Sequence, residues 1–147
     1  MIDFSTTTAF RLVRRLVMGQ GSAAMYLLIY EEGTESLIET DLRAEVDVQL
    51  SSALPIGRVS ELLDVDALLG LPDSGPIRVL RIDRWSPDLV TLLDTHVIRL
   101  EQTGAQFLFL TTPALAEQLL VEAPNFRNRL TDVLRFIPDD PSGGGGH

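Results

Sequence analysis

The chain has 147 residues, the length of one domain with a sizeable core, and its 45% hydrophobic and 22% charged residues are ordinary for a globular protein. It contains no cysteine, so disulfides and thiolate metal sites are excluded, and no apolar run approaches the roughly 18 residues that a membrane span needs. The formal net charge of −9 and the absence of a secretory pattern lead us to expect a cytoplasmic protein that binds neither nucleic acid nor membranes.

The first third of the chain predicts a helix, a buried strand and a second helix. Residues 6–19 have apolar side chains at helical spacing, with Ser5 or Thr6 as the cap and Gly19 at the end. Residues 23–32, AAMYLLIYEE, form the continuous apolar run of a strand that is buried on both faces. Residues 34–46 place apolar side chains on one helical face, and residues 46–50 alternate as in a short strand.

The rest of the chain continues this alternation. Residues 51–57 indicate a loop, residues 58–71 a helix, and residues 71–76, LPDSGP, a turn. A strand over residues 77–85 precedes a helix that is capped by Ser86, has Pro87 at its first position and stops at Gly104. Residues 105–112 predict another buried strand. Pro113 opens a helix that Pro124 interrupts; FRNRLTDVL continues as a further helix, and residues 135–138 form a last short strand.

Alternating strands and helices predict one α/β domain over residues 1–138. We expect a three-layer sandwich, with a mostly parallel sheet of four to five strands and helices on both faces. Residues 139–147, DDPSGGGGH, lack core-forming side chains and are expected to be a disordered, glycine-rich tail. Ligands of such sheets bind beyond the carboxyl ends of the strands. The candidate residues at these ends are Glu31, Glu32, Gly33, Asp83, Arg84, Trp85, Thr111 and Thr112.

The order of elements over residues 20–138 resembles the core of the phosphate-loop NTPases, particularly their AAA+ and STAND branches. VLRID, residues 79–83, is similar to a Walker B strand, whose terminal Asp engages magnesium. FLFLTT, residues 107–112, resembles the sensor strand near the γ-phosphate. APNFRNRLTDVLRFIP, residues 123–138, resembles the segment in which an arginine-bearing helix leads to a strand ending in Phe-x-Pro. Arg127 and Arg129 then correspond to the segment in which these relatives keep a nucleotide-sensing arginine.

The phosphate loop itself departs from the family pattern. The motif G-x-x-x-x-G-K-[ST] supplies backbone N–H groups, a lysine for the β- and γ-phosphates and a hydroxyl for Mg²⁺. Here the sequence is YEEGTES, in which Glu35 replaces the lysine if Ser36 takes the hydroxyl position. All twelve basic residues of the chain are arginine, so no lysine can compensate. A carboxylate about 4 Å from a phosphate costs about 1–4 kcal/mol. We therefore expect no ATP or GTP binding through this loop, and no cofactor.

The resemblance implies a non-catalytic, NTPase-like interaction or regulatory module in a bacterial signalling or conflict system. Its partner is expected to be another protein or domain, or a second copy of the chain. The N-terminal helix, with an apolar face and the pair Arg14 and Arg15, is one candidate docking surface. Trp85 is either an anchor for a partner or a packing residue. We expect no catalytic residue and no metal ligand set, since His96 has no second ligand nearby in the sequence.

Two other functions stay open at this point. Glu31, Glu32 and Asp83 are similar to the acidic trio of response-regulator receivers, with Thr111 or Thr112 after the next strand, so a magnesium-binding switch is the alternative. Receivers also use a lysine and begin with a strand, whereas this sequence contains no lysine and predicts a helix as its first element. The other possibility is a small-molecule sensor, which requires a formed apolar pocket at the strand ends.

Overall fold

A computed structural model describes residues 5–19, 22–50, 56–58, 77–82, 84–85 and 87–138. Several sequence-based predictions lie outside these residues: most of the helix at 58–71, the turn at 71–76, the roles of Asp83 and Ser86, and the tail at 139–147.

The described strands form one six-stranded sheet in the order β1-β6-β2-β5-β4-β3, and every pairing is parallel. The strands are β1 (Ser5–Thr7), β2 (Ala24–Ile29), β3 (Ile56–Arg58), β4 (Ile77–Arg81), β5 (Gln106–Thr111) and β6 (Asp132–Phe136). Helices separate most of the consecutive strands in the described part of the chain, because two parallel strands need a crossover connection between them. The predicted α/β class and parallel sheet are confirmed.

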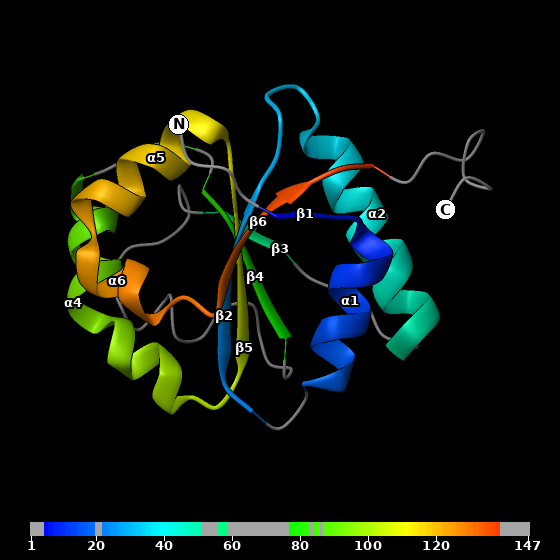
Figure 1. Cartoon of the computed structure of the whole chain (residues 1–147), viewed down its shortest axis with the longest axis horizontal. Helices are drawn as coiled ribbons and strands as arrows, with labels where there is room; N and C mark the ends of the chain where they lie inside the picture. The colour runs from blue at the N-terminus through cyan, green and yellow to red at the C-terminus, as the bar shows by residue number, and fades with distance from the viewer. Residues whose placement is uncertain are drawn as a thin grey trace.

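Helices cover both faces of the sheet and make three layers (Figure 1). Helices α1 (Ala9–Met18) and α2 (Glu35–Leu50) lie on one face; α4 (Pro87–Gln102), α5 (Pro113–Glu122) and α6 (Pro124–Arg129) lie on the other. Each face has its own core. Alternate residues of one strand enter different cores: Leu27 packs with α4, α5 and α6, whereas Leu28 packs with α1 and α2. This two-sided burial explains why β2 and β5 are continuous apolar runs.

The start of the chain differs from the prediction. Ser5–Thr7 is not the beginning of a helix but the edge strand β1, which pairs with β6 so that Thr6 faces Arg135. The helix α1 begins at Ala9, and Thr8 is its cap, with a hydroxyl that accepts a hydrogen bond from the Arg11 N–H at 3.3 Å. These polar and mostly β-branched residues adopt a strand conformation because they pair with β6, whereas helical periodicity alone assigned them to the helix.

Other boundaries were also predicted wrongly, among them the end of β4, which stops at Arg81 and not at residue 85. Residues 46–50 are not a strand, because α2 continues to Leu50 and buries Val46 against the sheet. Residues 57 and 58, where we expected a loop to end and a helix to begin, are both part of the strand β3. The last helix stops at Arg129, and β6 starts at Asp132, earlier than the predicted residue 135.

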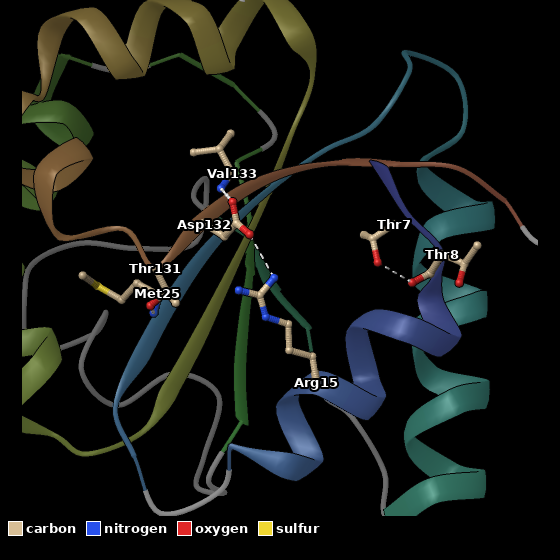
Figure 2. A network of polar contacts seen from close by, with 7 residues as sticks. All are labelled: Thr7, Thr8, Arg15, Met25, Thr131, Asp132 and Val133. Carbon is tan, nitrogen blue, oxygen red and sulfur yellow. Dashed lines mark hydrogen bonds and ion pairs between the residues drawn. The ribbon is translucent and has the colours of Figure 1, made fainter. Parts of the chain in front are cut away.

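Backbone pairing at the amino end of β2 explains the early start of β6. The Thr131 N–H donates to the Met25 carbonyl at 2.6 Å, and the Met25 N–H donates to the Thr131 hydroxyl at 3.1 Å (Figure 2). Nearby, Arg15 reaches from α1 to Asp132, with 2.9 Å between Nη1 and Oδ2, and its guanidinium lies 4.9 Å from the centre of the Tyr26 ring. Residues 131 and 132 therefore join β6 to β2 and α1.

A polar contact also fastens the opposite helical layer. Asp94 of α4 accepts hydrogen bonds from the backbone N–H groups of Asn125 and Phe126, at 2.7 and 3.3 Å. Its carboxylate therefore caps α6 from a neighbouring helix. The residue at the cap position of α6 makes no such side-chain hydrogen bond itself. Phe126 is fully buried and meets Phe109 of β5 edge-on, with 5.1 Å between the ring centres.

Candidate functional site

A cavity of about 410 Å³ opens at the carboxyl ends of β2, β4 and β5. These ends lie together because β2 and β5 pair along their full length, with Ile29 opposite Thr111, and β4 pairs with β5 beside them. The described lining residues come from the β2–α2 loop and the first residue of α2, from the last residue of β4 and the segment after it, and from the start of α5. They are Tyr30, Glu32, Glu35, Arg81, Ile82, Arg84, Trp85, Thr112, Ala114 and Leu115.

The β2–α2 loop forms a tight turn that binds its own carboxylate. Gly33 has a φ of 90°, which side chains rarely permit, and its N–H donates to the Glu35 Oε1 at 3.2 Å. The N–H and hydroxyl of Thr34 both donate to the Glu31 carbonyl, at 3.1 and 2.6 Å. Hydrogen bonds from the backbone N–H groups of Glu35 and Gly33, and the positive charge of Arg81, lower the pKa of the Glu35 carboxyl.

One residue that lines the cavity, Arg81, belongs to a largely buried ion pair. Arg81, the last residue of β4, has its Nη1 3.1 Å from Glu39 Oε2, and the side chains are only 17% and 8% exposed. Arg43 lies 3.7 Å from the other oxygen of Glu39 as a second, more exposed cation. Backbone pairing continues just past the strands, because Tyr30 donates to Thr111 and Ile82 donates to Leu110. Tyr30 and Ile82 are thus held at the base of the cavity.

The rim of the cavity carries opposite charges and apolar groups. Glu32 and Arg84 are exposed on it, and neither makes a hydrogen bond or ion pair with another described residue. Trp85 is half-buried and packs against the core beneath α4 and α5. Thr112 stands at the cap position of α5, but its hydroxyl makes no capping hydrogen bond. The rim therefore offers an anionic, a cationic, an aromatic and a hydroxyl group around one opening.

The structure brings together some of the predicted site residues and separates others. Glu32, Arg84, Trp85 and Thr112 line the cavity, and Gly33 shapes the loop beside it. Glu31 is outside the lining and forms an ion pair with Arg135 of β6. Thr111 is fully buried within β5. Asp83 lies outside the described residues.

Arg127 and Arg129 are not part of this cavity. Arg129 forms an ion pair with Glu101, 2.9 Å between Nη1 and Oε1, near the last turn of α4. That turn leads through Gly104 into the amino end of β5, whereas the cavity lies at the carboxyl end of the same strand. Both arginines are exposed on α6, which leads to the amino end of β6. The RNR segment therefore lies at the opposite end of the sheet from the loop at Gly33.

Sequence reasoning missed most of the cavity floor. Tyr30, Ile82 and Leu115 belong to apolar runs that indicate core and nothing more. One signal was present: Arg81 stands in a strand that is otherwise largely apolar, and a charged side chain at such a position needs a buried partner or an opening to solvent. Its partner, Glu39, could not be identified from one sequence.

The strand order of this sheet differs from the order found in response-regulator receivers. Receivers belong to the flavodoxin-like order 2-1-3-4-5, in which the first strand lies beside its two successors in sequence. Here β2 lies between β6 and β5, and β1 is at the edge of the sheet.

Among the described residues, no three acidic or histidine side chains converge as metal ligands. The described helices also include none with the length and apolar character to cross a bilayer.

Comparison of the chain with protein-family models, with curated proteins and with solved structures finds no significant match.

Proposed function

We propose that the chain is a non-catalytic, NTPase-like regulatory or protein-interaction module whose phosphate loop has become a self-capped turn. The observation that carries this proposal is the hydrogen bond from the Gly33 N–H to the Glu35 carboxylate at the start of α2. Phosphate loops bind anions through free backbone N–H groups at such a helix N-terminus. In this loop the chain's own carboxylate takes the N–H group of its single glycine.

Electrostatics and composition support the same conclusion. Glu32 and Glu35 both line the cavity, so a polyphosphate there would meet two carboxylates, at about 1–4 kcal/mol for each contact near 4 Å. The chain has no lysine to offset them. Of the two arginines in the lining, Arg81 is already paired with Glu39. A module that has lost nucleotide binding would keep the folded sheet and helices, while the N–H group of its loop is bonded to the chain's own carboxylate.

The sheet supports the NTPase-like part of the proposal. Counted from β2, the five strands β6, β2, β5, β4 and β3 lie in the order 5-1-4-3-2. This is the order that a resemblance to the AAA+ core implies, with the former phosphate-loop strand between the last two. The edge strand β1 and the helix α1 precede this core in the sequence and extend it past β6.

The proposed partner is another protein or domain, or a second copy of this chain, in a bacterial signalling or conflict system. The outer surface of α1 supports a docking role: Phe10 is 46% exposed, Met18 is 78% exposed, and Arg11 and Arg14 are also exposed. Exposed apolar groups flanked by arginine are common at protein interfaces.

Thermal unfolding with Mg²⁺ alone, with Mg-ATP and with Mg-GTP tests the proposal. A ligand at about 100 times its dissociation constant stabilises the folded state by about 2.7 kcal/mol, which raises Tm by several degrees for a domain of this size. We expect no shift with either nucleotide at millimolar concentration. A nucleotide-dependent rise in Tm would refute the self-capped loop. A rise with Mg²⁺ alone would favour the magnesium-binding switch.

A further inference from the structure

The cavity at the strand ends remains formed although its loop is closed to phosphates. Its volume of about 410 Å³ falls in the lower part of the range of small-molecule sites, about 300–1,000 Å³. A pocket at this place is the feature that a small-molecule sensor needs and that the sequence alone could not establish. The composition of its walls limits which ligands fit.

Two charged side chains of the cavity, of opposite sign, have no polar partner among the described residues. Arg81 is paired with Glu39, and Glu35 accepts from Gly33, so these charges are already engaged. Glu32 and Arg84 are exposed on the rim and make no polar contact with any other described residue. A purely anionic ligand would face Glu32 and Glu35, and a purely cationic ligand would face Arg84 and Arg81. A ligand with one charge of each sign avoids both penalties.

The remaining walls are apolar. Trp85 and Leu115 are half-buried side chains that pack on the core and also line the cavity, and Ile82, which is 2% exposed, closes its base. An apolar body placed between them would lose water contact on several sides, which favours binding in proportion to the apolar area removed from water. The Thr112 hydroxyl, which makes no capping hydrogen bond, supplies a neutral polar group beside this surface.

We propose that this cavity binds a small zwitterion with an apolar body, of the class of α-amino acids with large apolar side chains. In this arrangement Arg84 pairs with the carboxylate, Glu32 pairs with the ammonium group, and the side chain lies against Trp85 and Leu115. The inference rests on the proposed function in one respect, that the loop does not hold a nucleotide. It adds an effector ligand to the proposed regulatory module.

Trp85 is the only tryptophan of the chain and lines the cavity, so its fluorescence reports binding at this place. The titrations use L-phenylalanine and L-leucine, and the two analogues that each lack one charge, phenylpropionate and phenethylamine. We expect saturable changes with the amino acids. Each analogue should bind about tenfold more weakly than L-phenylalanine, because each loses one charge-assisted hydrogen bond.

Variants identify which side chain holds which group. Arg84→Gln should abolish the preference for L-phenylalanine over phenethylamine, and Glu32→Gln should abolish the preference over phenylpropionate. The matched controls Arg14→Gln on α1 and Glu122→Gln on α5 remove exposed charges that do not line the cavity, and they should keep both preferences. Circular dichroism of each variant shows that it is folded.

Three results would overturn the inference: no saturable change with any of these ligands, equal affinity for all of them, or unchanged preferences in the cavity variants. The same fluorescence titration with Mg-ATP separates this failure from failure of the proposed function. Binding of Mg-ATP would refute the proposed function and with it the premise of the inference, whereas binding of neither ligand would refute only the inference.

Discussion

Removing one partner of the ion pair between Glu39 and Arg81 should cost much of the stability, and replacing Glu39 by methionine tests this. Glu39 is 6% exposed on the sheet-facing side of α2, with its Oε2 3.1 Å from the guanidinium of Arg81. Methionine has a similar length and no charge. Glu39→Met would therefore leave Arg81, whose side chain is 17% exposed, without the carboxylate that it pairs with.

The expected cost follows from this burial. Removing one partner of a buried pair typically costs about 3–5 kcal/mol, because the other charge is left uncompensated. Arg81 retains contact with solvent through the cavity, so we expect the lower end, about 3 kcal/mol. For a chain of this length that corresponds to a fall in Tm of about 6–12 °C.

Urea denaturation of a double-mutant cycle measures the pair directly. Glu39→Met and Arg81→Met are compared singly and together, and Glu117→Met, at an exposed position of α5, is the control. The double variant should recover most of the loss, since two apolar side chains need no compensation. The reasoning fails if Glu39→Met is within about 0.5 kcal/mol of the control, or if the two single effects simply add.

Asp94→Ala should lower the free energy of unfolding by about 1–2 kcal/mol in urea, because α6 loses the cap that α4 provides, whereas Asp47→Ala at an exposed position of α2 should change it by less than about 0.5 kcal/mol. Equal losses in these two variants would show that Asp94 is not a cap. The pKa of Glu35 is lowered on folding, so its stabilisation is complete above about pH 4.3 and is lost as the pH falls through the folded-state value; Tm measured from pH 5 to 3 should fall less steeply in Glu35→Gln. An unchanged slope would contradict that contact. Asp132→Asn should cost less than about 1 kcal/mol, and the cost should shrink in high salt, because the pair with Arg15 is 44% and 37% exposed; a loss that is independent of salt would point to the backbone of β6 instead.

The central elements were predictable because their sequence patterns have one physical interpretation. The run that became β2 and the FLFL centre of β5 are continuously apolar, and only a strand covered on both faces buries every residue of such a run. Proline at the first position gave the starts of α4 and α5 directly, and Gly104, with a φ of 77°, marks the end of α4. These signals are local, and tertiary contacts only reinforce them.

The edges of the sheet were not predictable in the same way. The strands β1 and β3 are three residues each, too short for an alternating pattern to be recognised. Ser5–Thr7 becomes a strand because β6 lies beside it, and β6 is more than 120 residues away in sequence. The end of α2 was missed for a related reason: the alternation at residues 46–50 is compatible with a helix once Val46 faces the sheet and Gln49 hydrogen-bonds to Phe10 of α1.

The loop at Gly33 shows what sequence reasoning leaves out of a site. From the sequence, Glu35 counts only as a repulsive charge that stands where a lysine belongs. In the fold it is also an acceptor, and it already holds the N–H group that a phosphate would need. The repulsion and the hydrogen bond predict different outcomes for substitutions that aim to restore phosphate binding in this loop. Restoring a lysine elsewhere would remove part of the repulsion and leave the N–H group engaged. A working phosphate site would therefore require both a cation and the removal of the Glu35 carboxylate, and each change alone should leave nucleotide affinity undetectable in the unfolding assay.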